Sequence, residues 1–583
     1  MASFATARSE VGAALAALWL GLAAGPAAGA VTDAGALCPG NPDPCRVNTT
    51  IDVADGAVLD LGARTLEVLA NGRLDVGAGS MTIAAGAMRV RAGGRVTGFG
   101  GRIIIQTSGP IETEAMSRID VSAPAAGLIS LEAVGDVTLA GILDAHSGAG
   151  ADGGFVAVSG AAVAMHSTGR ALVGSESGAG GGVIFRAAGP LVVDAPLDAT
   201  GGAGGGGIDC DAETVVLNGR IDVSGGGGGG GALVDLRARG AVVVNGVLDG
   251  DARGSDAAGG GLAAEVSIDT QGPVELNGMI TLTGGAPGGE GGLIDVVAGG
   301  DVTQRGSIEA RGLGQGGVGG EVRLAADGGV TLGDIDVGAA DIANRVLVTS
   351  GGIVRLTGVL AAEPNAGGFG GVVDVTACAL DMDSAARVST VGTEGRTTLT
   401  SRGQMILRGS LAAGLENVLT IRDAASPPLI LGTITPSPTT RIDPLLPVCE
   451  LQPGPGSTTT TTLPPGECSD PALAPYDALL CRLSAISLTI ETSSPASLGG
   501  KRTARSLRRR AGRVLAAVEI ARSGERVAKK LGVASVQLAR LLARVQRRLA
   551  QGRFDPTIAT RLMDLGNTAA SEIEALRFQT SPA

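Results

Sequence analysis

The chain has few aromatic residues. Only 2% of its 583 residues are Phe, Trp or Tyr, with a single Trp, Trp19, and a single Tyr, Tyr476. Apolar residues are nevertheless plentiful, at 44%, and 98 residues are Gly. Pro at an ordinary level and the apolar content exclude a collagen and a charged disordered chain. The core must therefore be built from Val, Ile, Leu and Ala rather than from rings.

Long hydrophobic runs are absent beyond the N-terminus. The apolar run from Val11 to Ala24 follows Arg8 and precedes the small residues Ala28-Gly29-Ala30. This pattern is typical of a secretory signal peptide cleaved after Ala30. An uncleaved anchor is the alternative, but the run is shorter than the roughly 20 residues that a membrane span needs. We therefore expect a secreted or cell-surface protein whose mature chain has no transmembrane span.

Cysteine is scarce, and no spacing matches a metal site. None of the seven cysteines forms a CxxC pair, and only His146 and His166 could add imidazole ligands, which argues against zinc. In an oxidising compartment an odd number leaves at least one cysteine free or paired with another chain. The expected arrangement has four parts: a Cys38–Cys45 disulfide in an N-terminal cap, a Cys468–Cys481 disulfide, a buried Cys210, and an exposed, free Cys449.

Glycine marks an internal repeat. Glycine runs that lead directly into an alternating apolar strand recur every 24 to 31 residues between Gly101 and Gly320. A repeat of this length indicates one supersecondary unit stacked many times. Each repeat contains three short strands with period-two alternation, joined by Gly-rich loops such as Gly225 to Gly231, a pattern typical of a parallel β-helix. Inward side chains then stack on the same position of the next coil, so small aliphatic residues fill the core.

Three segments resemble coils of filamentous-haemagglutinin-type and autotransporter-passenger adhesins: RIDVSG at 220–225, LDATGG at 197–202 and LIDVVAGGDVTQRGSIEARG at 293–312. The resemblance implies a right-handed β-helix and an adhesive or structural role. The repeat length predicts about 13 to 15 coils. The fold class is thus mainly β, a single-stranded parallel β-helix followed by a small all-α antiparallel bundle.

The domain order follows from changes in composition and period. We expect a signal peptide at 1–30, a cap at 31–50, the β-helix at 51–448, a Pro/Thr-rich linker at 449–468 and a four-helix bundle at 469–583. In the last segment apolar residues recur every three or four positions along 479–490, 507–518, 527–549 and 558–576, which predicts four helices. Residues 471–583 contain 19 Lys and Arg against 8 Asp and Glu, whereas the remainder contains 26 against 49. An acidic rod is therefore joined to a basic bundle.

Two arginine stripes follow from helical spacing in the basic segment: Arg502, Arg505, Arg509 and Arg513 on one helix, and Arg540, Arg544 and Arg547 on another. Such stripes are suited to binding an anionic glycan, lipopolysaccharide or a cell-envelope surface. Nucleic acid is the least expected partner, because we expect the protein to be secreted. A solvated outer face that keeps the bundle soluble is the alternative.

A polar residue, most often Asp, recurs in the third strand of the repeat: Asp120, Asp144, Asp198, Asp222, Asp249, Thr281, Glu309 and Asp336. Stacked carboxylates about 4.8 Å apart repel one another unless they are hydrogen-bonded or bridged. Either each Asp accepts hydrogen bonds from the turn that follows it, or calcium bridges Asp198, Asp222 and Asp249. We favour the turn bonds and expect no resident cofactor.

The regular spacing of these carboxylates argues against a polysaccharide-cleaving site, which normally has an irregular acidic cluster and aromatic platforms. The repeats contain no Trp or Tyr, and His146 and His166 are 20 residues apart, less than one coil. The sequence favours a non-enzymatic extracellular or cell-surface protein, adhesin-like or structural, with a helical domain that anchors it or contacts an anionic partner. The alternative is a carbohydrate-active β-helix enzyme, a polysaccharide lyase or glycoside hydrolase.

Overall fold

The computed structural model describes residues 29–226, 231–253, 255–256, 259–365, 367–449, 475–494, 497–498, 501–522, 527–550 and 554–580. Nearly all of the predicted signal peptide, the linker beyond Cys449, and Cys468 lie outside these residues. The chain divides into two compact units, Met1–Gln452 and Pro453–Ala583.

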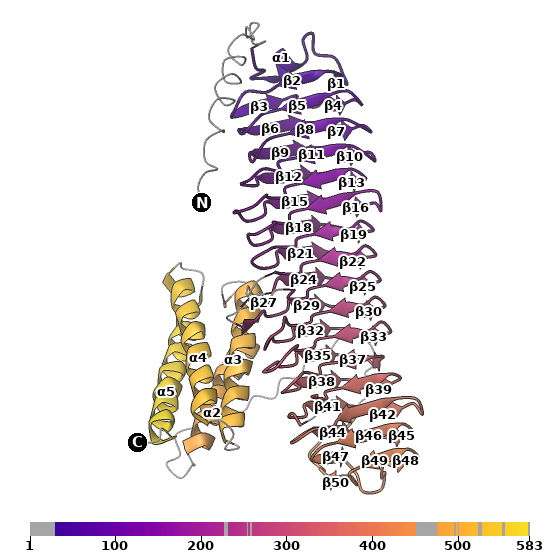
Figure 1. Ribbon diagram of the computed structural model, residues 1–583, viewed down its shortest axis with the longest axis vertical. Helices are drawn as coiled ribbons and strands as arrows, with labels where there is room; N and C mark the ends of the chain where they lie inside the picture. Colours follow the sequence, from indigo (N-terminus) through magenta and orange to yellow (C-terminus); the bar gives the residue numbers. More distant parts are fainter. Residues whose placement is uncertain are drawn as a thin grey trace, which may run out of the picture. The chain divides into compact units, whose positions relative to one another are not determined.

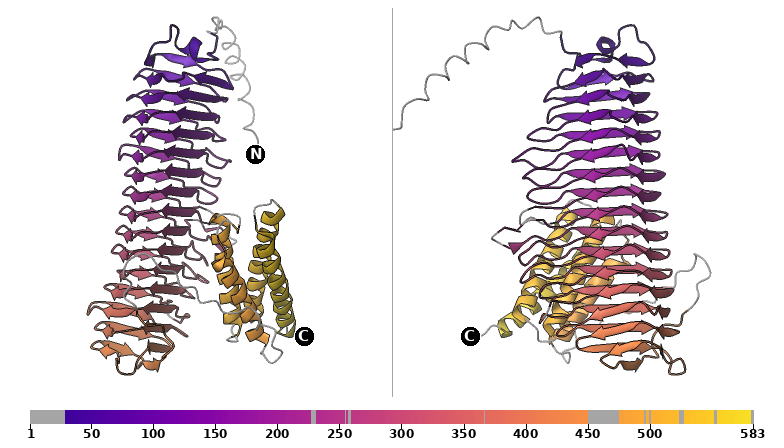
Figure 2. Two further views of the ribbon diagram at one scale, coloured as in Figure 1. Left: turned by 180° about the vertical axis from the view of Figure 1, so that it is seen from behind. Right: turned by 45° about the vertical axis from the view of Figure 1, so that its right-hand side comes forward.

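The first unit is a parallel β-solenoid with three sheets of 16 strands, and each coil adds one strand to every sheet (Figure 1). The first sheet runs from β1 (Cys45–Val47) to β48 (Leu429–Ile430) and the second from β2 (Thr50–Asp52) to β49 (Thr433–Thr435). The third sheet runs from β3 (Ala57–Asp60) to β50 (Thr439–Ile442). Fourteen coils lie between the two end coils. The parallel solenoid fold is therefore confirmed, and Figure 2 shows the strands stacked as successive rungs.

Inward side chains of successive coils stack into continuous rows. In the third sheet one such row consists of Ile105, Leu131, Val158, Phe185, Cys210 and Leu236, each at most 1% exposed. The prediction that Cys210 points into the coil in register with Leu236 is confirmed. Burial raises the pKa of the Cys210 thiol to about 12, so the reactive thiolate is scarce at neutral pH.

The Gly-rich loops allow neighbouring coils to approach closely at one corner. Gly225 pairs with Gly201 of the coil before it, and a Cβ added to Gly225 would lie 2.8 Å from the backbone nitrogen of Gly205. A Cβ on Gly231 would lie 2.2 Å from the carbonyl oxygen of Ala263. At these two positions any larger residue would collide with backbone. The run that joins them includes residues 227–230, outside the described residues.

The N-terminal end of the solenoid is covered by a short local segment. Helix α1 (Ala34–Leu37) buries Ala34 and Leu37, and the Asp33 carboxylate accepts a hydrogen bond from the Ala36 amide at 2.9 Å. Cys38, directly after the helix, forms a disulfide with Cys45 at the start of β1.

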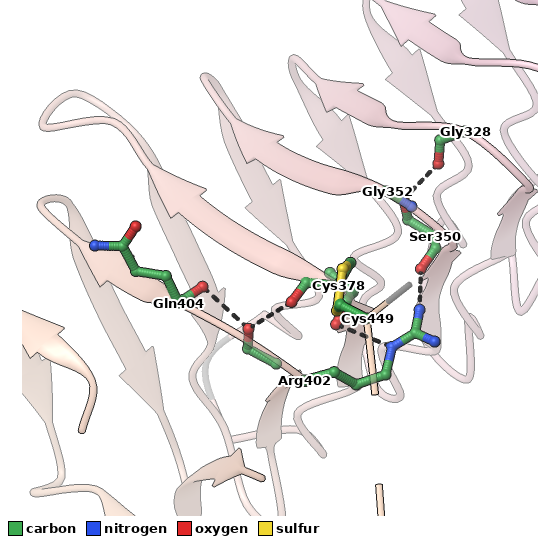
Figure 3. The surroundings of a disulfide bond; sticks show 9 residues. Gly328, Ser350, Gly352, Cys378, Arg402, Gln404 and Cys449 are labelled. Atoms are coloured by element: carbon green, nitrogen blue, oxygen red, sulfur yellow. Dashed lines mark hydrogen bonds between the residues drawn. A yellow bond between two sulfur atoms is a disulfide. The ribbon is translucent and has the colours of Figure 1, made fainter. Parts of the chain in front are cut away.

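The C-terminal end is held by a second disulfide, between Cys378 and Cys449 (Figure 3). The prediction of a free Cys449 is therefore wrong. Cys378 follows β41 (Val372–Ala377), and the third sheet continues through β44 (Arg396–Ser401) and β47 (Glu416–Ile421) to β50. The residues after β50 must therefore run back across three coils to reach Cys378. The two cysteines are 71 residues apart, so their proximity depends on coil register and not on any local pattern.

The described residues of the second unit form four helices: α2 (Pro475–Thr492), α3 (Lys501–Arg522), α4 (Val527–Ala550) and α5 (Pro556–Thr580). Their buried apolar residues, including Leu483, Val514, Leu538 and Ile573, form one hydrophobic cluster. Helix α2 contacts α3 and α5, and α4 also contacts both. In the described residues no helix is long and apolar enough to cross a membrane.

Candidate functional site

The carboxylate series lies on the outer face of the second sheet, in register along the solenoid. Asp120 of β11 (Arg118–Asp120) pairs with Asp144 of β14 (Ile142–Asp144), and Asp198, Asp222 and Asp249 occupy three successive coils further along. The row is interrupted between Asp144 and Asp198, where β17 (Arg170–Leu172) contributes Leu172. The series predicted from the sequence has no member in this coil, because Leu172 occupies the position of the carboxylate.

Each of these aspartates bonds to the turn that follows it. Asp198 accepts hydrogen bonds from the Thr200 amide at 3.1 Å and the Thr200 hydroxyl at 2.8 Å. Asp222 accepts the same two bonds from Ser224, at 3.2 and 2.6 Å. The amide two residues later also donates to the carboxylate in four other coils, those of Asp75, Asp120, Asp249 and Asp336. The favoured turn arrangement is therefore present along the series.

Arginine side chains contact Asp222 and Asp249, two of the three possible calcium ligands. The Arg220 guanidinium is 3.1 Å from Asp222 and 2.5 Å from Asp249, and Arg253 contacts the same two carboxylates at 3.2 and 2.5 Å. Burial alone would raise the pKa of Asp222, but hydrogen bonds from Ser224 and Arg220 and the nearby Arg253 charge together lower it. Guanidinium groups thus pair with both of these carboxylates.

Asp198 differs from Asp222 and Asp249 in its surroundings. Pro196 precedes its strand, and Asp198 has no ion-pair partner within the described residues. Across those residues no group of three or more His, Cys, Asp and Glu is arranged to hold a metal ion.

One coil of the row carries a histidine in place of the usual Ser, Thr or Gly. His146 Nδ1 lies 2.6 Å from Asp144 Oδ1, and the His146 amide donates to the same oxygen at 3.2 Å. The Asp144 side chain is 2% exposed and also binds Arg118 at 2.5 Å, whereas the His146 side chain is 48% exposed. The imidazole therefore makes the contact that a Ser or Thr hydroxyl makes elsewhere. The pairing of this histidine with a buried carboxylate was not foreseen from the sequence.

An asparagine ladder at the corner between the first and second sheets was missed by the sequence reasoning. Asn218 donates to Asp194 at 2.6 Å, Asn245 to Asn218 at 2.7 Å, and Asn277 to Asn245 at 2.9 Å. The sequence shows these asparagines as recurring Asn-Gly turns. The contacts between their side chains become apparent only when the coils are aligned.

The structure describes only part of the predicted arginine stripes. Arg513 is exposed, and Arg544 donates to the Ser506 hydroxyl at 2.6 Å, which links α4 to α3. The side chains of the remaining stripe residues, Arg502, Arg505, Arg509, Arg540 and Arg547, lie outside the described residues, as do those of Cys468 and Cys481. Arg544 therefore contributes to helix packing, and the Cys468–Cys481 disulfide stays a prediction.

Comparison with known proteins gives no match. No family model, no curated protein and no solved structure matches the chain. The resemblance to haemagglutinin-type and autotransporter coils therefore rests on the repeat pattern and on the solenoid fold.

Proposed function

We propose that this protein is a non-enzymatic, secreted or cell-surface rod, adhesin-like or structural, built on a right-handed β-helix. Its basic helical bundle anchors it or contacts an anionic partner such as an acidic glycan, lipopolysaccharide or the cell envelope. The observation that supports this proposal is that charged side chains along the second sheet bond to other groups of the solenoid. Carboxylates such as Asp222 and Asp249 are bonded to turns and arginines of their own and neighbouring coils, so they stabilise the stack.

A carbohydrate-active enzyme is the second candidate, and one site favours it. Asp120 and Asp144 lie side by side on neighbouring coils, with Arg118 contacting both carboxylates and His146 contacting Asp144. Two carboxylates, a guanidinium and an imidazole are groups that polysaccharide cleavage uses. In this protein, however, Asp120 also accepts two hydrogen bonds from Ser122, and Asp144 is 2% exposed.

A depolymerisation screen separates the two candidates. The mature chain, starting at Val31, is incubated with acidic and neutral polysaccharides, and new reducing ends and unsaturated products are measured. We expect no turnover. Turnover that Asp144→Asn abolishes, but the equally turn-bonded Asp336→Asn does not, would identify an enzyme and overturn the rod proposal.

The basic bundle is tested separately by its salt dependence. The full mature chain is titrated with lipopolysaccharide micelles at low and at high salt. Binding should weaken as salt screens the charges, and substituting Arg502, Arg505, Arg509 and Arg513 together by Gln should reduce it. Salt-independent binding would contradict an electrostatic contact.

A further inference from the structure

The two disulfides of the solenoid differ in how accessible they are. Cys38 is 4% exposed and Cys45 is 0% exposed, whereas Cys378 and Cys449 are both half-buried. Thiol–disulfide exchange requires an attacking thiolate to reach one of the two sulfur atoms. A reductant in solution therefore has access to the C-terminal pair of the folded protein, while burial protects the N-terminal pair.

The chain that leads to Cys449 is held loosely. Residues 443–448, which we call the strap, follow β50 and include Leu445, which is 90% exposed. The amide of Asp443 donates to a carbonyl of the neighbouring coil at 2.8 Å. Beyond it, the hydrogen bonds described for the strap are local, from the amides of Leu445 and Leu446 to Asp443. The far end of the strap therefore depends on the disulfide for its attachment to the solenoid.

Cys378, the other member of the pair, is fixed by its backbone. The Cys378 amide donates to the Gly352 carbonyl at 2.9 Å, and the Cys378 carbonyl accepts a hydrogen bond from the Gly403 amide at 2.8 Å. These bonds join Cys378 to the coils before and after it. Breaking the disulfide would therefore free the strap and leave Cys378 in place.

A positive charge lies close to the pair. Arg402 donates to the Ser350 carbonyl at 2.8 Å and to the carbonyl of Ala377, the residue before Cys378, at 3.5 Å (Figure 3). Among the described residues no carboxylate forms an ion pair with Arg402. A positive charge beside a cysteine favours the thiolate form, which is the leaving group of thiol–disulfide exchange. Arg402 therefore favours release of a thiolate from this disulfide.

We propose that the Cys378–Cys449 disulfide is a reducible switch whose substrate is a dithiol. One thiolate of the dithiol attacks a sulfur of the pair, which forms a mixed disulfide and releases a cysteine thiolate that takes up a proton. The second thiol of the dithiol loses its proton, attacks the mixed disulfide and releases the other cysteine. Two electrons thus pass to Cys378 and Cys449 from the dithiol, which becomes a disulfide.

The switch changes where the chain leaves the solenoid. While the disulfide is intact, Cys449 is held at the coil of β41, three coils before the end. After reduction the strap is attached only through β50, so the point of departure shifts by roughly 14 Å. Reduction also adds the strap to the chain that joins the two units. This inference goes beyond the proposed function, which assigns no regulation to the solenoid.

The test exposes the folded mature chain to dithiothreitol, blocks free thiols with N-ethylmaleimide at intervals and locates the label by mass spectrometry. We expect Cys378 and Cys449 to be labelled at least about tenfold faster than Cys38 and Cys45, because exchange depends on access. Equal labelling rates of the two pairs would overturn the proposal. So would a C-terminal pair that stays unlabelled until urea is added.

Variants of Arg402 test the contribution of its charge. Arg402→Gln should slow reduction of the C-terminal pair about threefold at neutral pH, and Arg402→Lys, which keeps the charge, should restore most of the rate. Arg422→Gln is the matched control, because Arg422 follows β47 as Arg402 follows β44, one coil further from Cys378. This control should leave the rate unchanged. An unchanged rate in Arg402→Gln, or equally slow Gln and Lys variants, would reject the role of the charge.

Hydrogen exchange of the selectively reduced chain measures release of the strap. Peptides that cover β50 should exchange faster after reduction, whereas peptides that cover β1 should not change. The Cys378→Ser/Cys449→Ser variant should show the same pattern without a reductant, and circular dichroism checks that it is folded. Unchanged exchange in β50 in both samples would show that the bond does not hold this end, and would reject the switch.

Discussion

The two ends of the solenoid are closed by different means. At the N-terminal end a single turn of helix and a disulfide between cysteines seven residues apart cover the first coil. At the C-terminal end the core of the last coil stays partly open, with Ile430 40% and Ile442 55% exposed. There a disulfide between cysteines 71 residues apart holds the last coils to an earlier one.

The difference shows two ways to protect the edge of a stacked sheet. The N-terminal cap covers apolar side chains directly. The last coil instead contains prolines on both sides of its short strands, at Pro427, Pro428, Pro436 and Pro438. Proline lacks the amide donor that another strand would need, so these residues discourage pairing with a second chain while leaving the coil exposed.

The largest effect should come from breaking the C-terminal disulfide. In the chain-entropy account, closing a 71-residue loop stabilises the folded state by about 4 kcal/mol. Replacing Cys378 and Cys449 by Ser should lower the free energy of unfolding by about that amount, measured by urea denaturation of the non-reduced protein. Reduction of the Cys38→Ser/Cys45→Ser variant, which lacks the N-terminal disulfide, should cause a similar loss. A variant as stable as the oxidised wild type would show that the bond does not constrain the end.

The N-terminal disulfide should matter less. The same account gives about 2 kcal/mol for a loop of seven residues. Urea denaturation of the Cys38→Ser/Cys45→Ser variant should therefore show about half the loss found at the other end. A larger loss here than at the C-terminal end would reverse the comparison and assign the main constraint to the cap.

The N-terminal coils should also be the more acid-sensitive end. Glu67, 8% exposed, contacts Arg91 at 2.6 Å and Arg46 at 3.0 Å. The Arg91 hydrogen bond is the main reason that the pKa of Glu67 is lowered, and burial opposes it only in part. A carboxyl with a lowered folded pKa stabilises the protein above its unfolded pKa of about 4.3, and this contribution disappears as pH falls through the folded value.

Glu67→Gln should therefore cost about 1 kcal/mol at pH 7 and flatten the loss of stability below about pH 4. Glu416→Gln is the matched control at the other end, since Glu416 pairs with Arg396 at 2.7 Å but is 29% exposed. Its effect on thermal unfolding measured from pH 3 to 7 should be smaller. Equal effects of the two variants would show that burial of the pair does not decide the acid response.

The smallest effect concerns the middle of the solenoid. Because Arg220 and Arg253 already bridge Asp222 and Asp249, millimolar calcium should shift the melting temperature by no more than about one or two degrees relative to a chelator. A bridging ion at 100 times its dissociation constant would add about 2.7 kcal/mol, a far larger shift. The Arg220→Gln/Arg253→Gln variant sharpens the test, since removing both guanidinium groups should increase its calcium response.

Much of the fold could be predicted from the sequence because its rules are local. Period-two alternation separates inward from outward residues, Gly-rich bends mark the corners, and an Asp two positions before a Ser or Thr bonds to its own turn, as Asp222 does with Ser224. The burial of Cys210 followed from the same alternation.

Other contacts depend on how residues of different coils align, which the sequence did not reveal. Coil lengths vary because the corner loops vary, so residues that share a row cannot be found by counting a fixed interval. Only the stacked coils place the Asn218 side chain on Asn245, and Cys378 beside Cys449. The sequence by itself determined the repeated coil and its local turns, because these depend on neighbouring residues. The tertiary structure decided which distant residues meet, because that depends on the summed length of every loop between them.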